Sequence, residues 1–362
     1  MTSNTLWFIY NFNISLIQHL KQGYKIIIVA PIDEYQDLLV NYVDEIIDIK
    51  INSSGTSPVE DSWLTYQYYK IFKEVKPDII LSYTIKPNIY GNLAAARLGI
   101  PVINTITGLG TIFIKENFAT KIGEVLYRGS FKYSSHTFFL NQADKGTFLE
   151  RDLTSPDLVS IVPGSGIDTT HFKTDRKQNK GKVFLFVGRL LGDKGIRELI
   201  EAFKIVIQEY PNIELRIAGE LGSNNKTAVK ESELSEWLLI PQINYLGKTD
   251  DIISEMEKAD VMILPSYREG LSRSLLEAAS MGMPIISSNV PGCIEVVRDN
   301  ENGFLCKPRN SADLAMKIKK MMHISEEVRL SMGKKGRKIV EEEFDQKIVN
   351  ELYGGRIDQI LN

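Results

Sequence analysis

Short apolar runs alternate with longer amphipathic segments along most of this 362-residue chain. Most of the apolar runs are bounded by Gly, Pro, Asn, Asp or Ser, as β-strands usually are. Near-continuous apolar strands joined by crossover helices are typical of parallel sheets that are buried on both faces. The pattern therefore predicts an α/β protein with strands over 25–30, 44–49, 79–83, 102–105, 137–141, 158–161, 183–188, 214–218, 243–246, 261–265 and 284–287.

The strands and their intervening helices form two series rather than one. The break falls at Pro163-Gly164-Ser165-Gly166, and the polar residues 173–182 after it are typical of a solvated linker. We therefore expect an N-terminal Rossmann-like domain over 1–162 and a C-terminal one over 163–341. Helices are expected over 13–22, 61–75, 89–98, 119–133, 195–209, 250–258, 273–281 and 311–322.

The start of the chain is unusual for such a domain. A doubly wound domain opens with its central strand, and residues 1–4 are too short for one. Either residues 6–10 form that strand, or residues 3–7 are the loop after a strand that lies upstream of Met1. A missing central strand would expose sheet edges and leave the first core underfilled.

Composition and charge exclude several classes of protein. A hydrophobic fraction of 43% and a charged fraction of 25% are ordinary for a soluble protein. The net charge of −3 argues against a nucleic-acid-binding protein. Cys293 and Cys306 lie in no CxxC motif, so we expect a reducing compartment without a disulfide or zinc site. No signal peptide or membrane span is predicted, which leaves a soluble protein or one on a membrane surface.

Residues 266–277 join a predicted strand to the start of a helix. Open α/β sheets hold anionic ligands at such a junction, because the helix N-terminus favours phosphate. Ser272 is a suitable N-cap residue, so Glu269 precedes the helix and Glu277 lies on its second turn. A phosphate site with two carboxylates for hydroxyl groups fits a sugar nucleotide. A solvated surface would place two such carboxylates equally well, but the surrounding pattern is more specific.

A second loop of this kind opens the C-terminal series. Gly188 allows close approach of the backbone, while Arg189 and Lys194 suit phosphate oxygens. Taken alone, the loop is as consistent with two incidental cations as with a phosphate site. The first loop in the same predicted sheet favours the phosphate site.

Together these motifs resemble the retaining GT-B glycosyltransferases of family 4. The family's E-x7-E signature matches Glu269 and Glu277, and its G-R-x-x-x-x-K-G signature matches 188–195. The likeness spans nearly the whole chain, and residues 82–91 and 105–110 are similar to the branch that builds capsule, O-antigen and lipid-linked oligosaccharides, including diphosphoundecaprenol-dependent N-acetylgalactosaminyltransferases. It implies two Rossmann-like doubly wound parallel-sheet domains facing across a cleft, with 342–362 as helices that return to the N-terminal domain.

The resemblance also implies roles for single residues. Arg189 and Lys194 would neutralise the donor diphosphate, Glu269 would bind the transferred sugar, and Glu277 would bind the ribose. Catalysis would rest on Arg189, Lys194 and Glu269, with retention at the anomeric carbon and no metal or other cofactor. The donor site as a whole would comprise Gly188, Arg189, Lys194, Glu269, Gly270, Leu271, Ser272 and Glu277, with residues 246–248 near the base.

The acceptor side follows from the strand-end rule, since polar residues after strands face a ligand in α/β domains. Ordinary polar loops explain the same residues equally well. The helix at 118–132 carries Lys121, Arg128 and Lys132 beside apolar residues, which suits either anionic lipid or ordinary packing. The acceptor candidates are Lys86, Asn88, Thr107, Gly108 and Gly110, with Tyr83 and Asn104 beside them.

Two departures from the family are visible in the N-terminal half. Residues 4–10 contain no glycine where many relatives have a Gly-rich loop, and no histidine lies between His19 and His136. We still expect a cytoplasmic enzyme, weakly attached to the inner membrane surface, that moves a hexose or N-acetylhexosamine from a UDP-sugar to a polyprenyl-diphosphate-linked glycan. The alternatives are a non-hydrolysing UDP-sugar 2-epimerase and an inactive sugar-nucleotide-binding partner subunit. Neither the sugar nor the acceptor is specified by the sequence.

Overall fold

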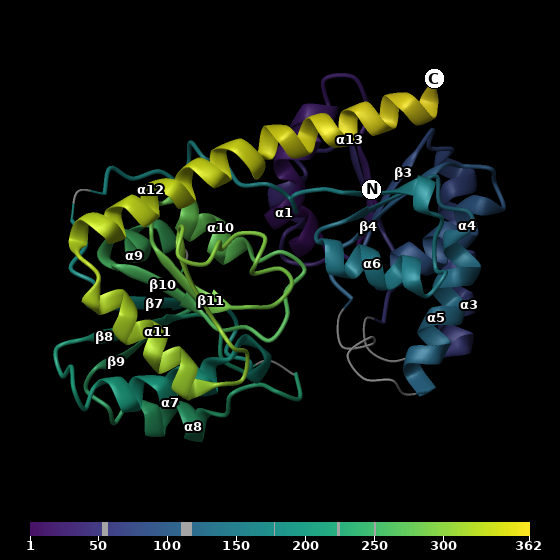
Figure 1. Ribbon diagram of the computed structural model, residues 1–362. Coiled ribbons are helices and arrows are strands. Elements are labelled where there is room, and N and C mark those ends of the chain that lie inside the picture. The colour runs from purple at the N-terminus through teal and green to yellow at the C-terminus, as the bar shows by residue number, and fades with distance from the viewer. Residues whose placement is uncertain (53–56, 110–117, 177, 223–224, 250) are drawn as a thin grey trace. The chain divides into compact units, whose positions relative to one another are not determined.

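The computed structural model describes residues 1–52, 57–109, 118–176, 178–222, 225–249 and 251–362. These residues form two compact units (Figure 1). Unit 1 comprises Met1–Gly166 and Gln346–Asn362, and unit 2 comprises Ile167–Asp345. Each unit is a parallel sheet with helices on both faces, so the α/β class predicted from the alternating pattern is confirmed.

The sheet of unit 1 is parallel throughout. Its strands pair in the orders β2-β1 and β3-β4-β5-β6. Their bounds are β1 (Ile27–Ala30), β2 (Glu45–Asp48), β3 (Ile80–Tyr83), β4 (Val102–Ile106), β5 (His136–Phe139) and β6 (Val159–Ile161).

The first residues of the chain join these two groups of strands. Thr2 bridges β1 and β3 in parallel, donating its N–H to Leu81 O at 2.9 Å and accepting from Tyr83 N at 3.0 Å. On the other side, Val29 N donates to Met1 O at 2.9 Å. Residues 1–3 therefore form a very short extended segment at the centre of the sheet, between β1 and β3.

The suggestion that residues 6–10 form the first strand is wrong, because they begin helix α1 (Leu6–Leu20). Thr5 caps this helix by accepting a hydrogen bond from Phe8 N on its hydroxyl. The buried residues Leu6, Ile9 and Asn13 follow the helical period rather than the alternation of a strand.

Helices cover both faces of the unit 1 sheet. On one face α1 packs against the C-terminal helix α13, and on the other α3, α4, α5 and α6 share a core of large aromatic side chains. The helices are α1, α2 (Gln36–Leu39), α3 (Pro58–Val75), the π-helical turn η1 (Pro87–Gly91), α4 (Asn92–Ala96), α5 (Phe118–Phe131), α6 (Gln142–Glu150), the 3-10 turn η2 (Pro156–Leu158) and α13 (Gln346–Leu361).

Unit 2 has a single parallel sheet in the order β12-β11-β10-β7-β8-β9. Its first strand in the chain lies in the middle, and the winding reverses between β7 and β10. Ligands of open α/β sheets bind outside the carboxyl ends of the strands at such a reversal. The strands are β7 (Val183–Val187), β8 (Glu214–Ala218), β9 (Ile243–Gly247), β10 (Val261–Leu264), β11 (Ile285–Ser288) and β12 (Gly303–Cys306).

In unit 2, helices α7, α8 and α11 lie on one face of the sheet, and α9, α10 and α12 lie on the other (Figure 1). Helices α2, α6, α8 and α12 and strand β12 are absent from the sequence-based expectation, because α2, α6, α8 and β12 are short and the long α12 carries few apolar residues. The elements are η3 (Gly192–Lys194), α7 (Ile196–Val206), α8 (Glu231–Trp237), α9 (Ile252–Lys258), α10 (Arg273–Ser280), α11 (Ser311–His323) and α12 (Glu326–Glu343).

The polar segment 173–182, expected as a solvated linker at the start of the C-terminal domain, is hydrogen-bonded to the rest of unit 2. Arg176 donates to the carbonyls of Met256 and Ala259 at 2.7 and 2.6 Å. Asp260 accepts from the backbone N–H groups of Lys180, Lys182 and Val183 at 2.9 to 3.1 Å. Side chains of this segment thus have two roles: Arg176 and Asn179 satisfy carbonyls before β10, whereas the remaining charged ones that the structure describes are exposed, as expected.

Candidate functional site

The loops after β7 and β10 lie against each other at the switch point of unit 2. Tyr267 N and Ser266 Oγ both donate to Asp193 O, at 2.9 and 3.1 Å. Gly195 has φ +71°, and a Cβ atom there would lie 2.0 Å from Pro265 O. Only glycine permits this approach, so the two predicted loops are held together by their backbones.

Lys194 and Glu269 meet across this contact. Lys194 Nζ donates to Oε1 and Oε2 of Glu269 at 2.6 and 2.8 Å. Their side chains are 24% and 12% exposed, so a ligand can still reach them. Lysine has a third donor and each carboxylate oxygen a second lone pair, so the pair can bind a phosphate oxygen and a hydroxyl group together.

Arg189 follows β7 directly and has an exposed side chain. Within the described ranges its guanidinium makes no hydrogen bond or ion pair, so it is available to an anion. Gly188 N donates to Ala218 O at 3.0 Å, and a Cβ atom at Gly219 would lie 1.8 Å from Gly188 O. The glycine after β8 therefore positions the backbone that carries Arg189.

The loop after β11 holds the backbone around Glu269 in place. Glu269 N donates to Pro291 O at 3.1 Å, and Ser272 N donates to Gly292 O at 3.0 Å. Gly292 has φ +82°, and a Cβ atom there would lie 2.4 Å from both Cβ and O of Glu269. Three βα loops thus fix the backbone of this carboxylate.

Glu277 lies on the second turn of α10, as predicted, and Ser272 is the N-cap residue, although its side chain makes no capping hydrogen bond. Arg273 Nε donates to Glu277 Oε1 at 2.9 Å, a pairing that the sequence interpretation missed despite its i,i+4 spacing. Burial raises the pKa of Glu277, against the opposing effects of Arg273 and His171.

The remaining donor candidates lie on the same loops. Ser272 is buried, Gly270 and Leu271 are half-buried, and Leu271 packs against the unit 2 core. Gly247 O accepts from Gly219 N at 2.8 Å, which ties the end of β9 to the end of β8. Lys248 beyond it is exposed.

The sequence interpretation did not select Tyr267 as a site residue. Its hydroxyl donates to Glu198 Oε1 at 2.6 Å, and the Arg309 guanidinium lies 4.5 Å from the centroid of its ring. Burial, followed by the hydrogen bond to Glu198, raises the pKa of the Tyr267 hydroxyl. Its position between Glu269 and the strand end was the only available signal.

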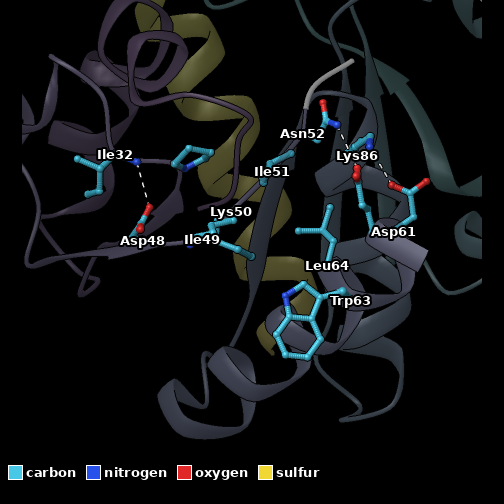
Figure 2. Close-up of a pocket in the computed structure, with 12 residues that line it drawn as sticks. Ile32, Asp48, Ile49, Lys50, Ile51, Asn52, Asp61, Trp63, Leu64 and Lys86 are labelled. Carbon is cyan, nitrogen blue, oxygen red and sulfur yellow. Dashed lines mark hydrogen bonds and ion pairs between the residues drawn. The ribbon is translucent and has the colours of Figure 1, made fainter. Parts of the chain in front are cut away.

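In unit 1, Lys86 forms a buried ion pair rather than an open cation (Figure 2). Its Nζ donates to Asp61 Oδ1 at 2.8 Å, and the Tyr90 hydroxyl donates to Asp61 Oδ2 at 2.8 Å. The side chains of Lys86 and Asp61 are 10% and 8% exposed. This arrangement fastens α3 to the loop after β3.

Asn88 is likewise tied into the interior. Its Nδ2 donates to Thr105 O at 2.9 Å, its Oδ1 accepts from Asn104 Nδ2 at 3.1 Å, and the hydroxyls of Thr105 and Tyr353 lie 2.6 Å apart. Tyr83 is buried within β3, Thr107 and Gly108 are half-buried after β4, and Gly110 lies outside the described residues.

In α5, Arg128 donates to the carbonyl of Arg151 at 2.9 Å, while Arg151 pairs with Glu124. Across the described ranges, no helix is long and apolar enough to cross a membrane. The same residues contain no group of three or more His, Cys, Asp or Glu side chains arranged to hold a metal ion. Cys293 and Cys306 are unpaired and buried, and burial raises the pKa of their thiols to about 12 and about 11.

Comparison with known proteins identifies two matching family models. Residues 168–339 match the model described as glycosyl transferases group 1, and residues 5–142 match the model described as glycosyl transferase 4-like.

Two curated relatives are similar over most of their length. The N,N'-diacetylbacillosaminyl-diphospho-undecaprenol alpha-1,3-N-acetylgalactosaminyltransferase of Campylobacter jejuni is 26% identical over 98% of this chain and 96% of its own. The UDP-Gal:alpha-D-GlcNAc-diphosphoundecaprenol alpha-1,3-galactosyltransferase of Escherichia coli is 26% identical over 90% of this chain and 87% of its own.

Among solved structures, HepE from Anabaena in complex with UDP and glucose matches with a TM-score of 0.79 at 20% identity, over 95% of each chain. This likeness confirms the expected GT-B fold class.

Proposed function

Because this chain belongs to the glycosyl transferases of group 1, we propose that it transfers a hexose or N-acetylhexosamine from a UDP-sugar to a polyprenyl-diphosphate-linked glycan. The Lys194–Glu269 pair supports this proposal most strongly, because it brings a phosphate-binding cation and a hydroxyl-binding carboxylate to one point at the switch of the sheet. The activities for which the Campylobacter and Escherichia relatives are named support the donor and acceptor classes.

The proposed reaction breaks the bond between the anomeric carbon and the β-phosphate oxygen of the donor. The acceptor oxygen attacks the same face of that carbon, so configuration is retained, and its proton passes to the leaving phosphate oxygen. Negative charge grows on the diphosphate during this step. Arg189 and Lys194 stabilise that charge electrostatically, which requires no metal ion.

In this scheme the carboxylates bind hydroxyl groups and take no covalent part. Glu269 holds the transferred sugar. Lys194 fixes the orientation of the Glu269 carboxylate by donating to both of its oxygens. Glu277 binds the ribose, with Arg273 oriented beside it. The carboxylate pair of a glycosidase works differently, because one carboxyl group there protonates the leaving group.

We further propose that the enzyme works at the cytoplasmic face of the inner membrane, held weakly by its lipid-linked acceptor. The acceptors named for the Campylobacter and Escherichia relatives carry diphosphoundecaprenol and support this location. In α5, Arg128 already bonds backbone carbonyls, which favours a packing role for this helix over lipid contact.

A test begins with thermal-shift measurements against a panel of nucleotide diphosphate sugars. A UDP-sugar that binds the native state raises the melting temperature. Incubation of that donor with a diphosphoundecaprenol-linked glycan should then give a longer glycan and free UDP. Product with the β-anomeric configuration from an α-linked donor would contradict retention.

Two controls separate the alternative activities. Incubation with UDP-N-acetylglucosamine alone would yield the manno epimer only if the protein is a 2-epimerase. A partner subunit without activity would bind UDP, as measured by the thermal shift, but would transfer nothing. The Glu269→Ala variant should lose transfer while its unfolding remains cooperative.

A further inference from the structure

A pocket of about 500 Å³ lies in unit 1, where the chain leaves β1 and β2 and enters α3 (Figure 2). This is the carboxyl edge of a parallel sheet, where α/β domains bind ligands. No residue of the predicted acceptor set except Lys86 lines it. The lining residues are Pro31, Ile32, Asp48, Ile49, Lys50, Ile51, Asn52, Glu60, Asp61, Trp63, Leu64 and Lys86.

Two large apolar side chains of this pocket are exposed. Trp63 is 58% exposed and Ile32 is 43% exposed, although large apolar side chains are normally covered. Trp63 packs on one side against Tyr66, with the ring centroids 5.3 Å apart. A pyranose ring presents C–H groups on its face and hydroxyls at its edge, so an open indole in a polar pocket suits a sugar.

The polar groups offer hydrogen-bond donors and acceptors together. Asp48 uses Oδ1 to accept from Ile32 N at 3.2 Å, and Glu60 uses Oε2 to accept from Asn52 Nδ2 at 3.0 Å. Their second oxygens are unused within the described chain, and Lys50 is exposed without an ion-pair partner there. A pocket lined by two such acceptors, one ammonium and an aromatic ring matches a sugar, whose hydroxyls both donate and accept.

Charge disfavours a phosphate as the occupant. The lining contains three carboxylates and two ammonium groups, and Lys86 is already neutralised by Asp61. Asp48 and Glu60 therefore outweigh Lys50, and a diphosphate would be repelled. A neutral, hydroxyl-rich ligand is favoured.

We propose that this pocket binds a neutral sugar residue of the acceptor glycan, with Trp63 as the stacking surface and Glu60 and Asp48 as hydroxyl acceptors. The assignment to the acceptor rests on the proposed transferase function, whereas sugar binding itself does not. The buried Lys86–Asp61 pair and Tyr90 fix the adjoining turn of α3, so the site is formed before the ligand arrives.

Saturation-transfer NMR with the methyl glycosides of glucose, galactose, N-acetylglucosamine and N-acetylgalactosamine tests binding directly. At least one glycoside should receive saturation from the wild type and from Glu269→Ala, in which the donor site is impaired. Trp63→Ala should lose the signal, Trp63→Tyr should restore most of it, and Tyr133→Ala, which removes an aromatic ring 49% exposed in unit 1, should keep it. Trp63 is exposed, so these variants are expected to fold.

Signal that survives Trp63→Ala, or is absent from the wild type, overturns the proposal. With a diphosphoundecaprenol-linked glycan as acceptor, Trp63→Ala should raise the acceptor KM at least tenfold and leave the KM for the UDP-sugar unchanged. Glycoside binding that depends on Trp63 without any transfer would contradict the proposed function and support the pocket. Transfer by Trp63→Ala with an unaltered acceptor KM would support the proposed function and contradict the proposed role of the pocket.

Discussion

The two units share a winding pattern, and each has a lysine beside the point where the winding reverses, but the two lysines differ in their exposure. In each unit the first segment lies between the second and fourth; Lys194 follows the first segment of unit 2, and Lys86 follows the fourth segment of unit 1. Lys194 of unit 2 pairs with Glu269, and both remain within reach of a ligand, whereas Lys86 of unit 1 pairs with Asp61 in the interior. Topology thus places a cation beside the reversal in both units, but its neighbours decide whether it stays accessible to a ligand or is buried in the fold.

The largest expected effect concerns the buried pair of unit 1. Lys86→Met should lower the free energy of unfolding by about 3–5 kcal/mol, because it leaves the Asp61 carboxylate buried without its cation. Urea denaturation followed by circular dichroism measures this change.

The double variant Lys86→Met/Asp61→Leu serves as its control. Removing both charges should recover most of the stability, because no uncompensated charge remains. If Lys86→Met unfolds like the wild type and instead loses activity, Lys86 serves a ligand and the contrast between the units fails.

Lys194→Ala in unit 2 should affect catalysis rather than stability. We expect kcat for transfer to fall about 10²–10³-fold, since a preorganised positive charge near the leaving diphosphate is lost. Its effect on urea denaturation should be smaller than that of Lys86→Met, because the Lys194 pair is more exposed. Initial rates at saturating donor measure the loss, and a rate within threefold of the wild type would contradict the role.

The sequence predicted the unit 2 loops because their chemistry is local. Gly195 and Gly292 are required by backbone contacts at positive φ, and Lys194 and Glu269 occur at fixed positions beside them. In unit 1 the same strand-end rule selected Lys86 and Asn88, but their partners, Asp61 and Thr105, are distant in the chain. A polar residue after a strand looks the same in sequence whether it binds a ligand or a buried partner.

Residues 1–3 and 173–182 are two further segments whose structure depends on hydrogen-bond partners far away in the chain. The central strand position of unit 1 is filled by so few residues that no periodicity is detectable. The polar 173–182 segment satisfies carbonyls and Asp260 of unit 2, which its composition conceals. Most strands and helices with their own period were predicted, although α12 and β12 were not, and segments defined by long-range hydrogen bonds were missed.

His136 in β5 should make unit 1 the acid-sensitive half. Burial, and to a lesser degree Arg356, lowers the pKa of His136 from 6.5 to about 4. The folded state therefore binds fewer protons than the unfolded state, so stability is full above pH 6.5 and is lost as pH falls towards 4. The loss should approach about 2–3 kcal/mol.

His136→Gln should flatten this pH dependence between pH 4 and pH 6.5. Urea denaturation at several pH values, compared with the wild type, measures the difference between the two curves. An equal decline in both proteins would place the acid sensitivity elsewhere.

The smallest effects are expected when one glycine in each unit is replaced by alanine. Gly195→Ala should destabilise unit 2 by about 1–3 kcal/mol, because φ is +71° and the new Cβ would meet Pro265 O at 2.0 Å. Gly355→Ala, within α13 of unit 1, meets no atom within 4 Å and should stabilise by about 0.5–1 kcal/mol, since alanine has the higher helix propensity. Thermal denaturation with and without UDP distinguishes them: Gly195→Ala should also diminish the UDP-induced shift, while Gly355→Ala should leave it intact. A Gly195→Ala protein that keeps the full shift would mean that contact between the two βα loops is not needed to hold the diphosphate.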